Sequence, residues 1–308
     1  MRKFKELKKR MPKPIIDVAI GILLNKNKVL VGWREAKQHQ GNKHEFPGGK
    51  VESNESPVEA CRREIYEEVG VGIKEWHVFD QITHEYDDVI VQLHLFHAFV
   101  PDELLALIHQ PWSWFTRDQL KNLNFPKAND AILQRLSWPH FIKVSELLDS
   151  FSSNRLQYWR SKNLVKQNIR QILEHLSEVE LDAVILNQDQ WQELDYDLQK
   201  KIKTIHLKQH QLMQLKQGDL VVSKRYIAAC HDLVALNHAH KLGCDAVFIS
   251  PVQATPTHPE AIALGWDGFD QIAEHSHIPV FALGGLHPND LEQAIKHGAY
   301  GVAGIRNF

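Results

Sequence analysis

The sequence of 308 residues is short of cysteine, of long apolar runs and of charge of one sign. Its three cysteines, Cys61, Cys230 and Cys244, form no CxxC pair, so we expect no disulfide framework and a reducing, cytoplasmic location. No apolar run approaches the 18 residues of a membrane span, which argues against a membrane protein. The formal net charge of -2 gives no reason to expect stable nucleic-acid binding, and composition leaves the oligomeric state open.

The first thirteen residues stand apart from the rest because they hold seven Lys or Arg and one Glu. No apolar stretch of the kind found in a secretory signal follows them. We expect a solvated basic tail over 1–13, with a nucleic-acid-binding arm as the alternative and Met11 as an alternative start. The length then suits two domains, which we place at 14–137 and 138–308.

The first domain mixes strand-like and helix-like patterns. A turn at 25–27 separates two apolar runs, and a polar loop over 34–45 follows them. Pro57 suits the first turn of a helix, Ser56 its cap and Gly70 its end. The predicted strands and helices are 15–24, 28–33, helix 57–69, 76–83, 89–100 and helix 128–136.

After about residue 138 the pattern of apolar residues changes. Short apolar runs now alternate with helix-length segments such as 163–178, 232–242 and 288–297. Alternation of strand and helix is typical of parallel βα units, and eight units predict a (β/α)8 TIM-type barrel, small for that fold. The chain ends before a helix could follow the last strand. The eight runs are 140–145, 155–159, 181–187, 203–207, 219–223, 245–250, 278–283 and 299–305.

The most informative stretch runs from Gly49 to Val71. On the helix predicted there, Glu64, Glu67 and Glu68 are at i, i+3 and i+4, so their carboxylates share one face. Like charges on one face repel, and a hard divalent cation with oxygen ligands is the natural compensation. Such a cation would neutralise polyphosphate oxygens and lower the pKa of an attacking water. A solvated acidic helix face is the alternative.

The spacing of this stretch favours the metal. Gly49 is followed after five residues by Glu55 and after seven more by the segment Arg63 to Val71. This pattern resembles the Nudix box, and it implies a Nudix α/β/α sandwich with a mixed sheet. Glu55 and Arg63 are placed to pair and to fix the loop against the helix.

The surrounding 120 or so residues resemble the MutT branch of that family, which hydrolyses oxidised purine nucleoside triphosphates such as 8-oxo-dGTP. Three local signatures carry the resemblance: Arg34 with His39, the run from Glu45 to Lys50, and the Ala128-Asn129 pair. An Asn amide both donates and accepts, which suits a purine edge.

The resemblance implies roles for individual residues. The metal ligands would be the Gly48 carbonyl, Glu64, Glu67 and Glu68, for Mg²⁺ or Mn²⁺, with Arg63 among the catalytic residues. The substrate-binding residues would be Arg34, His39, Glu45, Phe46, Gly48 and Asn129. Two positions depart from the pattern, since Val89 replaces an Arg near the nucleotide and Ser113 replaces a Glu outside the box.

The second half resembles thiamine phosphate synthase and its TenI-like relatives, most strongly over about 219–305. The segment 250–257, the pair Gly284-Gly285 and the run 301–304 carry this resemblance. Glycines after the last two strands imply a phosphate site made by backbone N–H groups of Gly284, Gly285 and Gly304.

The catalytic positions of that second family are altered. Gln157, Arg160 and Lys162 keep a Gln/Arg/Lys cluster with an extra residue inserted, whereas Gln188 and Gln211 stand where acidic metal ligands are expected. A metal held by carboxylates would be lost with them, so we expect a degenerate domain that does not make thiamine phosphate.

These patterns together predict a Mg²⁺-dependent nucleoside triphosphate pyrophosphohydrolase fused to a degenerate thiamine-phosphate-synthase-like barrel. The expected reaction converts 8-oxo-dGTP to 8-oxo-dGMP and pyrophosphate, which would keep oxidised nucleotides out of DNA replication and repair. One alternative keeps the Nudix chemistry but takes a thiamine diphosphate derivative as substrate. Another makes the barrel a sensor of a phosphorylated metabolite that regulates the hydrolase.

Overall fold

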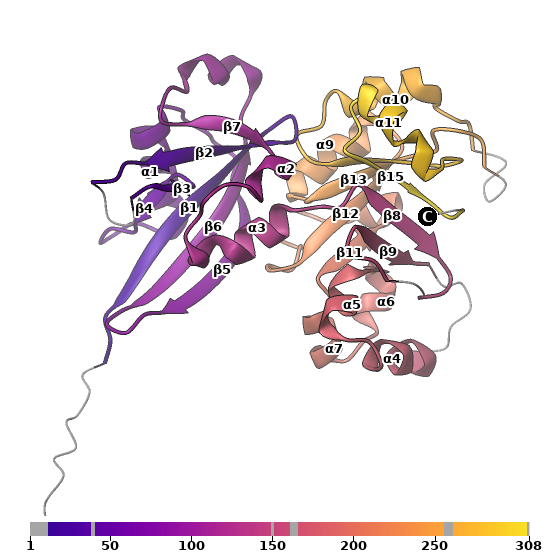
Figure 1. Cartoon of the computed structure of the whole chain (residues 1–308), viewed down its shortest axis with the longest axis horizontal. Helices are drawn as coiled ribbons and strands as arrows, with labels where there is room; N and C mark the ends of the chain where they lie inside the picture. The colour runs from indigo at the N-terminus through magenta and orange to yellow at the C-terminus, as the bar shows by residue number, and fades with distance from the viewer. Residues whose placement is uncertain (1–11, 38–40, 149–150, 161–165, 256–260, 307) are drawn as a thin grey trace, which may run out of the picture.

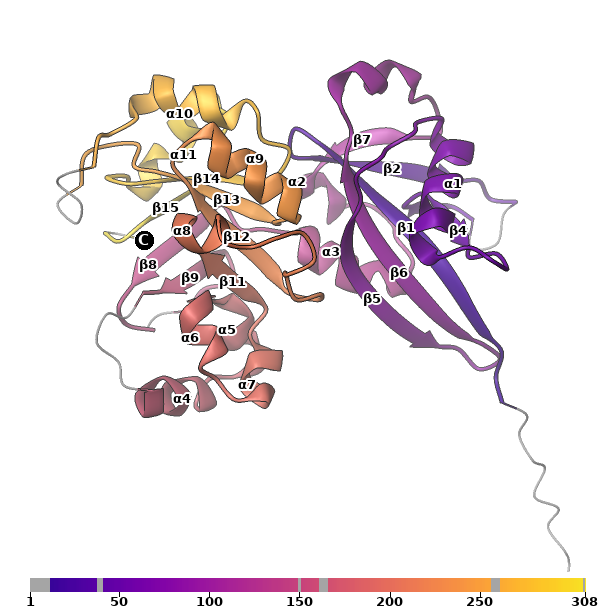
Figure 2. The ribbon, with the colours of Figure 1, turned by 180° about the vertical axis from the view of Figure 1, so that it is seen from behind.

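The computed structural model describes residues 12–37, 41–148, 151–160, 166–255, 261–306 and 308. The chain forms two bodies that lie side by side, a twisted mixed sheet with its helices and a closed barrel (Figures 1 and 2). Most of the tail predicted at 1–13 lies outside the described residues. The α/β architecture, with a mixed sheet first and a parallel barrel second, confirms the predicted fold class.

The first body is a seven-stranded sheet in the order β3-β2-β1-β6-β5, with β4 added to β1 and β7 to β2. The strand β1 is its centre, because it pairs in parallel with β6 over ten residue pairs and antiparallel with β2 and β4. The strands are β1 (Ile15–Asn25), β2 (Lys28–Arg34), β3 (Lys43–Glu45), β4 (Gly48–Lys50), β5 (His77–Glu85), β6 (Ile90–Phe99) and β7 (Ser113–Thr116).

Helices cover both faces of this sheet. The long helix α1 lies on the side away from the barrel, and α2 and α3 lie on the side toward it (Figures 1 and 2). The helical segments of this body are α1 (Pro57–Val69), η1 (Asp102–Leu107), α2 (Arg117–Leu120), η2 (Lys127–Asn129) and α3 (Asp130–Leu136).

The second body closes eight parallel strands into a barrel, in the order β10-β11-β12-β13-β14-β15-β8-β9. The strands are β8 (Phe141–Ser145), β9 (Arg155–Trp159), β10 (Val184–Asn187), β11 (Thr204–Leu207), β12 (Arg225–Cys230), β13 (Ala246–Ile249), β14 (Val280–Leu283) and β15 (Gly301–Gly304). The helical segments around it are α4 (Lys166–Glu174), α5 (Glu178–Ala183), α6 (Gln188–Gln192), α7 (Tyr196–Lys201), α8 (Gln209–Leu212), α9 (Leu233–Leu242), α10 (Gly265–Ala273), η3 (Pro288–Asp290) and α11 (Leu291–Lys296).

Two barrel strands differ from their predicted positions. The prediction of a strand at 219–223 was wrong: that segment is a turn, and the strand is β12, which begins at Arg225. Val221 and Val222 are apolar but 44% and 43% exposed, while Ser223 takes a positive φ of 70° that no strand allows. The run 181–187 also divides, because its first three residues end α5 and only Val184–Asn187 is strand.

The polar loop predicted at 34–45 is partly a strand, since its last three residues form β3 against β2. The helix prediction for 57–69 is confirmed at both ends. Glu59 accepts hydrogen bonds from the Ser56 N–H at 2.7 Å and from the Ser56 hydroxyl at 2.6 Å, which fixes the first turn. Gly70 ends the helix with φ of 82°, a conformation that costs glycine nothing.

One large apolar cluster spans both bodies. Buried residues of the sheet, such as Phe79 and Leu136, belong to the same cluster as Ala239 and Leu242 of the barrel helix α9. Across the junction, the Asn27 N–H donates to the His277 carbonyl at 3.2 Å. We therefore treat the sheet body and the barrel as one packed unit.

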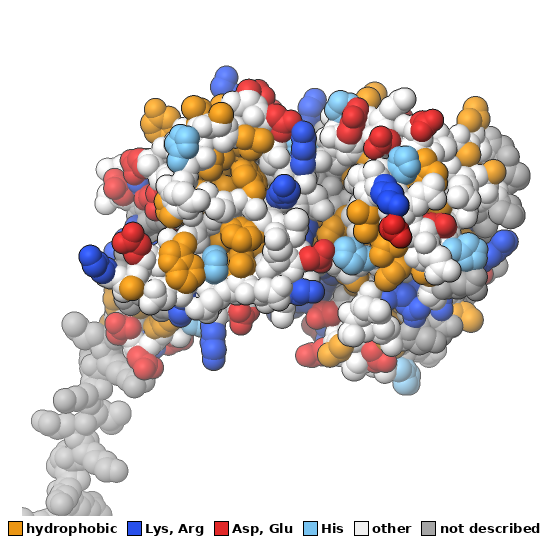
Figure 3. Space-filling view, turned by 45° about the horizontal axis from the view of Figure 1, so that its top comes forward, with side chains coloured by type: hydrophobic (Ala, Val, Ile, Leu, Met, Phe, Trp, Pro, Cys, Tyr) orange, Lys and Arg blue, Asp and Glu red, His pale blue; other side chains and the backbone are white. Residues whose placement is uncertain are grey.

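The surface is mixed in charge. On the face in Figure 3, lysine and arginine side chains alternate with aspartate and glutamate over both bodies. Among the described residues, no helix combines the length and the apolar character needed to cross a membrane.

Candidate active site on helix α1

Helix α1 presents two opposite faces. Ala60, Cys61, Ile65 and Val69 are buried against the sheet, with Ile65 fully enclosed. Glu67 and Glu68 are exposed, and the Glu64 side chain is 16% exposed beside them. The apolar spacing therefore fixes the rotation of the helix, and this rotation turns the three carboxylates away from the core.

Arg63 organises the acidic face. Its guanidinium donates to Glu55 at 2.8 Å, to Glu64 at 2.8 Å and to Glu67 at 3.3 Å. A further bond of 3.1 Å to the Lys50 carbonyl ties the helix to the strand β4. The predicted pairing of Arg63 with Glu55 is confirmed. The carboxylates hold the pKa of Arg63 above its usual value, so the cation stays charged.

The glycines of the loop allow this close approach. A Cβ at Gly49 would stand 2.3 Å from the carboxylate of Glu64, so no larger residue fits while Glu64 keeps its place. Gly48 has φ of +148°, and a Cβ there would stand 2.2 Å from the Ala19 carbonyl oxygen. The Gly48 N–H donates to Glu68 at 3.0 Å. The backbone of Gly48 and Gly49 therefore packs directly against the carboxylates of the site.

The Glu68 carboxyl is partly shielded from water. Although the residue is exposed as a whole, its carboxyl end turns in toward the Gly48 N–H. Loss of surrounding water raises the pKa of Glu68 to about 7, and the neighbouring carboxylates of Glu45 and Glu64 add to the rise. The Gly48 N–H and Arg34 act in the opposite direction. The rise in the pKa of Glu68 is therefore mainly an effect of burial. The excess of acid shows in the contacts: Arg34 and Arg63 are bonded to Glu45, Glu55, Glu64 and Glu67, and Glu68 adds a fifth carboxylate.

The carboxylates do not form a finished metal cage. Within the described part of the chain, no group of three or more His, Cys, Asp or Glu side chains is arranged to hold a metal ion. Arg63 draws Glu64 and Glu67 toward itself, while Glu68 turns to Gly48. The donor chemistry nevertheless fits a hard divalent cation, because the helix α1 supplies three carboxylates, and carboxylate oxygens are the ligands that such cations prefer.

Arg34 and Glu45 lie beside this cluster. The Arg34 guanidinium forms an ion pair with Glu45, with its Nε 2.7 Å from the carboxylate. Both residues affect the pKa of Glu68, which places them next to the helix α1. The structure thus brings together Arg34, Glu45, Gly48 and the carboxylates of α1. His39 lies outside the described residues.

The segment that carries Asn129 runs along β3. The backbone N–H of His44 donates to the Asn124 carbonyl at 2.7 Å, and the Asn124 N–H donates back to the His44 ring at 3.2 Å. Phe46 stacks on Phe125, with ring centroids 5.0 Å apart. The Asn129 residue is 8% exposed. Asn129 is therefore a nearly buried amide, four residues after Phe125 and directly before α3.

The two positions that depart from the MutT pattern also have clear places. Val89 lies in the turn between β5 and β6, where its carbonyl accepts from the Tyr86 N–H at 2.8 Å. Ser113 begins β7 opposite Val31. Sequence reasoning missed the neighbouring Trp112, whose indole donates to the Glu68 carbonyl at 2.8 Å and so anchors the last turn of the acidic helix. The run of two tryptophans at 112 and 114 was the available signal.

Comparison with known proteins agrees with this geometry. Residues 19–135 match the NUDIX domain family, and residues 154–308 match the thiamine monophosphate synthase family. The chain is 32% identical over 123 residues to 8-oxo-dGTP diphosphatase of Escherichia coli (strain K12), covering 39% of this chain and 95% of that protein.

The chain joins a Nudix hydrolase domain to a domain of the thiamine monophosphate synthase family. The barrel domain is 39% identical over 71 residues to thiamine-phosphate synthase of Thermosynechococcus vestitus (strain NIES-2133 / IAM M-273 / BP-1), covering 23% of this chain and 20% of that protein. Among solved structures, a MutT protein from Methanosarcina mazei Go1 is 24% identical, with a TM-score of 0.36, and covers 41% of this chain and 95% of its own.

The carboxyl end of the barrel domain keeps its glycines. Gly284 and Gly285 follow β14 with φ of 108° and 71°, and a Cβ at either would strike the segment 251–254. At Gly304 a Cβ would stand 2.3 Å from the ring of Phe308. The three glycines thus lie where backbone approaches closely, although the packing of Phe308 limits the room at Gly304.

Gln211 is buried near the same end and is fully engaged with protein. Its amide exchanges hydrogen bonds with Asn187 at 2.9 and 3.2 Å, and its oxygen also accepts from the Lys208 N–H at 2.8 Å. The residue that replaces an expected acidic ligand therefore acts as a structural bridge between β10 and α8.

Proposed function

We propose that the Nudix domain is a Mg²⁺-dependent pyrophosphohydrolase of nucleoside triphosphates, with 8-oxo-dGTP as substrate and 8-oxo-dGMP and pyrophosphate as products. The observation that carries the proposal is the gathering of carboxylates at the Gly48-Gly49 loop, where Glu64 lies against Gly49 and Glu68 is bonded to Gly48. A divalent cation is the ligand that such a gathering favours. Removal of 8-oxo-dGTP would keep the oxidised base out of DNA during replication and repair.

The cation would be held by Glu64, Glu67, Glu68 and the Gly48 carbonyl. When bound there, it would supply positive charge to the polyphosphate oxygens and promote loss of a proton from the attacking water. Arg63 keeps Glu64 and Glu67 oriented through its two bonds of 2.8 and 3.3 Å. Arg34 and His39 would contact the phosphates or the sugar, as the resemblance to MutT-like proteins implies. Water adds to phosphorus, and the bond between the nucleotide and the pyrophosphate breaks.

The base would lie against the wall made by Phe46 and Phe125. Asn129 supports this assignment because its amide, at the start of α3, offers both a donor and an acceptor to a purine edge. A site that hydrogen-bonds a base rejects analogues that leave its polar groups unpaired. The similarity to 8-oxo-dGTP diphosphatase of Escherichia coli supports the same substrate.

A second candidate substrate is an oxidised derivative of thiamine diphosphate. The fused barrel favours it, because it belongs to the thiamine monophosphate synthase family. The chemistry at the carboxylates of α1 would be unchanged, and only the part of the substrate that contacts Phe46 and Asn129 would differ.

A substrate panel tests the proposal. The full chain is incubated with Mg²⁺ and each of 8-oxo-dGTP, dGTP, CTP and oxidised thiamine diphosphate, and kcat/KM is measured from pyrophosphate or phosphate release. We expect the highest kcat/KM for 8-oxo-dGTP, and pyrophosphate as its product. A higher value for oxidised thiamine diphosphate would establish the alternative, and absence of turnover with every substrate would overturn both.

A further inference from the structure

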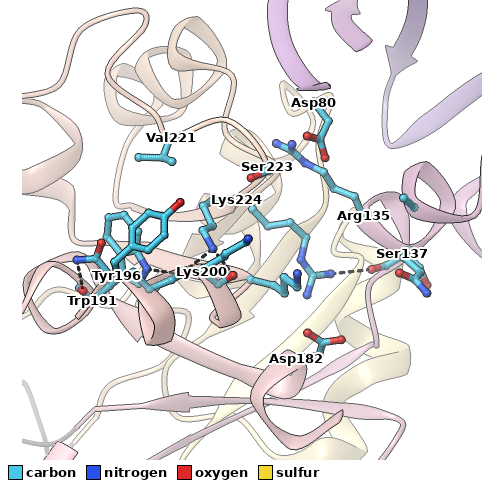
Figure 4. A pocket seen from close by; sticks show the side chains of 15 residues that line it. Asp80, Arg135, Ser137, Asp182, Trp191, Tyr196, Lys200, Val221, Ser223 and Lys224 are labelled. Carbon is cyan, nitrogen blue, oxygen red and sulfur yellow. Dashed lines mark hydrogen bonds between the residues drawn. The ribbon is translucent and has the colours of Figure 1, made fainter. Parts of the chain in front are cut away.

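A cavity of about 880 Å³ lies between the Nudix domain and the barrel (Figure 4). On the Nudix side, Asp80 of β5 and the residues Ala131, Gln134 and Arg135 of α3 line it. On the barrel side it meets the starts of strands, because Lys203 precedes β11 and Arg225 begins β12. This size is ordinary for a small-molecule site.

The cavity is separate from both sites described above. The carboxylate helix α1 lies on the far side of the sheet from the barrel (Figures 1 and 2). The glycines Gly284 and Gly304 follow or end their strands, so they lie at the carboxyl end of the barrel, where barrel enzymes carry their active sites. The cavity opens at the opposite, amino end.

Cations dominate the lining. The lining holds five cationic side chains and two acidic ones, Asp80 and Asp182. Asp245, which is bonded to Arg135, is a third acidic group close to the cavity. The cationic residues are Arg135, Lys200, Lys203, Lys224 and Arg225. Since the net charge of the whole chain is -2, this local excess of positive charge is not a general property of the surface.

Two of the cations are enclosed without a carboxylate bond. The Lys224 ammonium donates to the carbonyls of Gln199, Lys200 and Ile202 at 2.7, 2.9 and 2.7 Å, and the residue is 6% exposed. Burial lowers the pKa of Lys224 to about 8, and nearby Lys203 adds to this effect. These three bonds use all the N–H donors of the ammonium group, so Lys224 contributes positive charge beside the cavity but offers no donor to a ligand.

Arg225 is the second such cation. Its guanidinium donates to the Thr204 hydroxyl at 3.0 Å and to the Ser137 carbonyl at 3.1 Å, and lies over the Trp138 ring at 4.6 Å. These two bonds use only part of the five N–H donors of an arginine. Burial lowers the pKa of Arg225 to about 10, which an anion in the cavity would reverse.

Lys200 and Lys203 are exposed at the rim, and Figure 4 shows Lys200 and Lys224 on the same side of the cavity, near Tyr196. Flexible ammonium groups at the rim can reach a multivalent oxyanion, while the enclosed Arg225 fixes its inner end. We propose that this cavity binds a phosphate-bearing small molecule through Lys200, Lys203 and Arg225. The site goes beyond the proposed hydrolysis, and its ligand would contact α3, the helix that directly follows Asn129.

Binding to the full chain tests the proposal. Calorimetric titrations are run in EDTA at low ionic strength, without turnover, with inorganic phosphate, pyrophosphate, AMP and the uncharged control adenosine. The test variant is Lys200→Gln/Lys203→Gln, and the matched control is Lys201→Gln/Lys241→Gln, which removes two exposed lysines outside the lining.

We expect at least one phosphate-bearing probe to bind the native chain and the control variant equally, and the test variant at least tenfold more weakly. Equal affinity for phosphate and AMP would identify the phosphoryl group as sufficient, and tighter binding of AMP would identify a nucleotide. Absence of binding by all three anions, equal binding by the test variant, or adenosine binding as tightly as AMP would overturn the proposal.

Hydrogen exchange of the native chain supplies an answer that does not depend on the folding of any variant. Adding the probe that binds should slow amide exchange in peptides that cover 199–203 and 221–225. Unchanged exchange in both peptides would also overturn the proposal. Because no activity is measured, failure here is distinct from failure of the proposed hydrolase function.

Discussion

The guanidinium Nε of Arg135, on α3 of the Nudix domain, lies 2.9 Å from the carboxylate of Asp245, just before β13 of the barrel. A second bond of 3.3 Å joins the same groups, and the two side chains are only 9% and 6% exposed. Asp245 also accepts from the Tyr226 N–H at 2.9 Å. One buried ion pair therefore fastens the two domains to each other.

Removing the charge from one partner should destabilise the protein. We expect Asp245→Asn to lower the free energy of unfolding by about 3 kcal/mol, because Arg135 would stay buried without its counter-ion. Glu292→Gln is the control, since it breaks the exposed pair with Lys296 and should cost less than about 1 kcal/mol. Urea unfolding of the full chain measures both. Equal effects of the two substitutions would contradict the role assigned to the buried pair.

The carboxylates of α1 should be needed for chemistry and not for folding. We expect Glu67→Gln and Glu68→Gln each to lower kcat by orders of magnitude, because both carboxylates would hold the metal. The melting temperature should change little, because Glu67 is 57% exposed and an amide oxygen at position 68 can still accept from the Gly48 N–H. Added EDTA should abolish turnover by the native chain, and Mg²⁺ or Mn²⁺ should restore it. Glu75→Gln, an exposed residue beyond the helix, is the control. Activity that persists in EDTA would rule out the metal.

Asn129 should set the choice of base. We expect Asn129→Ala to reduce the preference for 8-oxo-dGTP over dGTP by roughly ten- to a hundredfold, the effect of one lost polar partner in a desolvated site. The exposed Asn122→Ala should leave the preference unchanged. The measurement is the ratio of kcat/KM for the two nucleotides. A ratio that is the same in Asn129→Ala and the native chain would remove Asn129 from the base site.

Four histidines gather at the domain junction and should make stability depend on pH. Phe99 lies between them, with His97 at 5.6 Å, His240 at 5.0 Å and His277 at 5.5 Å between ring centroids. His77 packs on His97 at 5.1 Å. Burial lowers the pKa of all four rings, to about 3 for His240 and well below the usual value for His97.

The direction of this pH dependence follows from proton binding. The unfolded chain takes up protons near pH 6.5, whereas the folded chain keeps these rings neutral until a lower pH, so acid favours unfolding. The contribution of these rings to stability should be fully present above about pH 7. Below about pH 6.5 the free energy of unfolding should fall by about 1.4 kcal/mol per pH unit for each ring that stays neutral. His97→Leu should reduce this slope, and the exposed His109→Leu should not. Identical slopes in His97→Leu and the native chain would refute the assignment.

Much of the fold was predictable because local signals fixed it. The helix α1 matched at both ends, since Ser56, Pro57 and Gly70 determine where it starts and stops. Apolar runs likewise placed most barrel strands. The strand β12 was misplaced because Val221 and Val222 form an apolar pair in an exposed turn, while the true strand starts with the cation Arg225.

The carboxylate site was predictable because its residues come from one helix and one loop. The domain junction was not, because its contacts join residues far apart in the chain. Arg135 and Asp245 are 110 residues apart, and each is of a type usually found in solvent. The same holds for the cavity cations Lys200 and Arg225, whose meeting with α3 depends on how the two domains pack.

The barrel domain should not make thiamine phosphate. Synthesis in that family requires a metal to hold the pyrophosphate leaving group, and in this chain Gln188 and Gln211 occupy the two expected acidic positions. A neutral amide supplies no charge to offset the desolvation of Mg²⁺. Gln211 is, moreover, already committed to Asn187 and the Lys208 N–H, so rotating it toward a metal would leave buried polar groups unpaired.

Asp189 is the acid nearest in sequence to Gln188, but it lies at the start of α6, where its N–H is bonded to the Asn187 side chain at 3.2 Å. Its carboxylate is 64% exposed and 4.0 Å from the Lys208 ammonium. A strain that lacks thiamine phosphate synthase and carries this chain should therefore still need added thiamine, and the purified protein should form no thiamine phosphate. Growth without thiamine together with turnover in vitro would contradict this prediction and show that the protein has two activities.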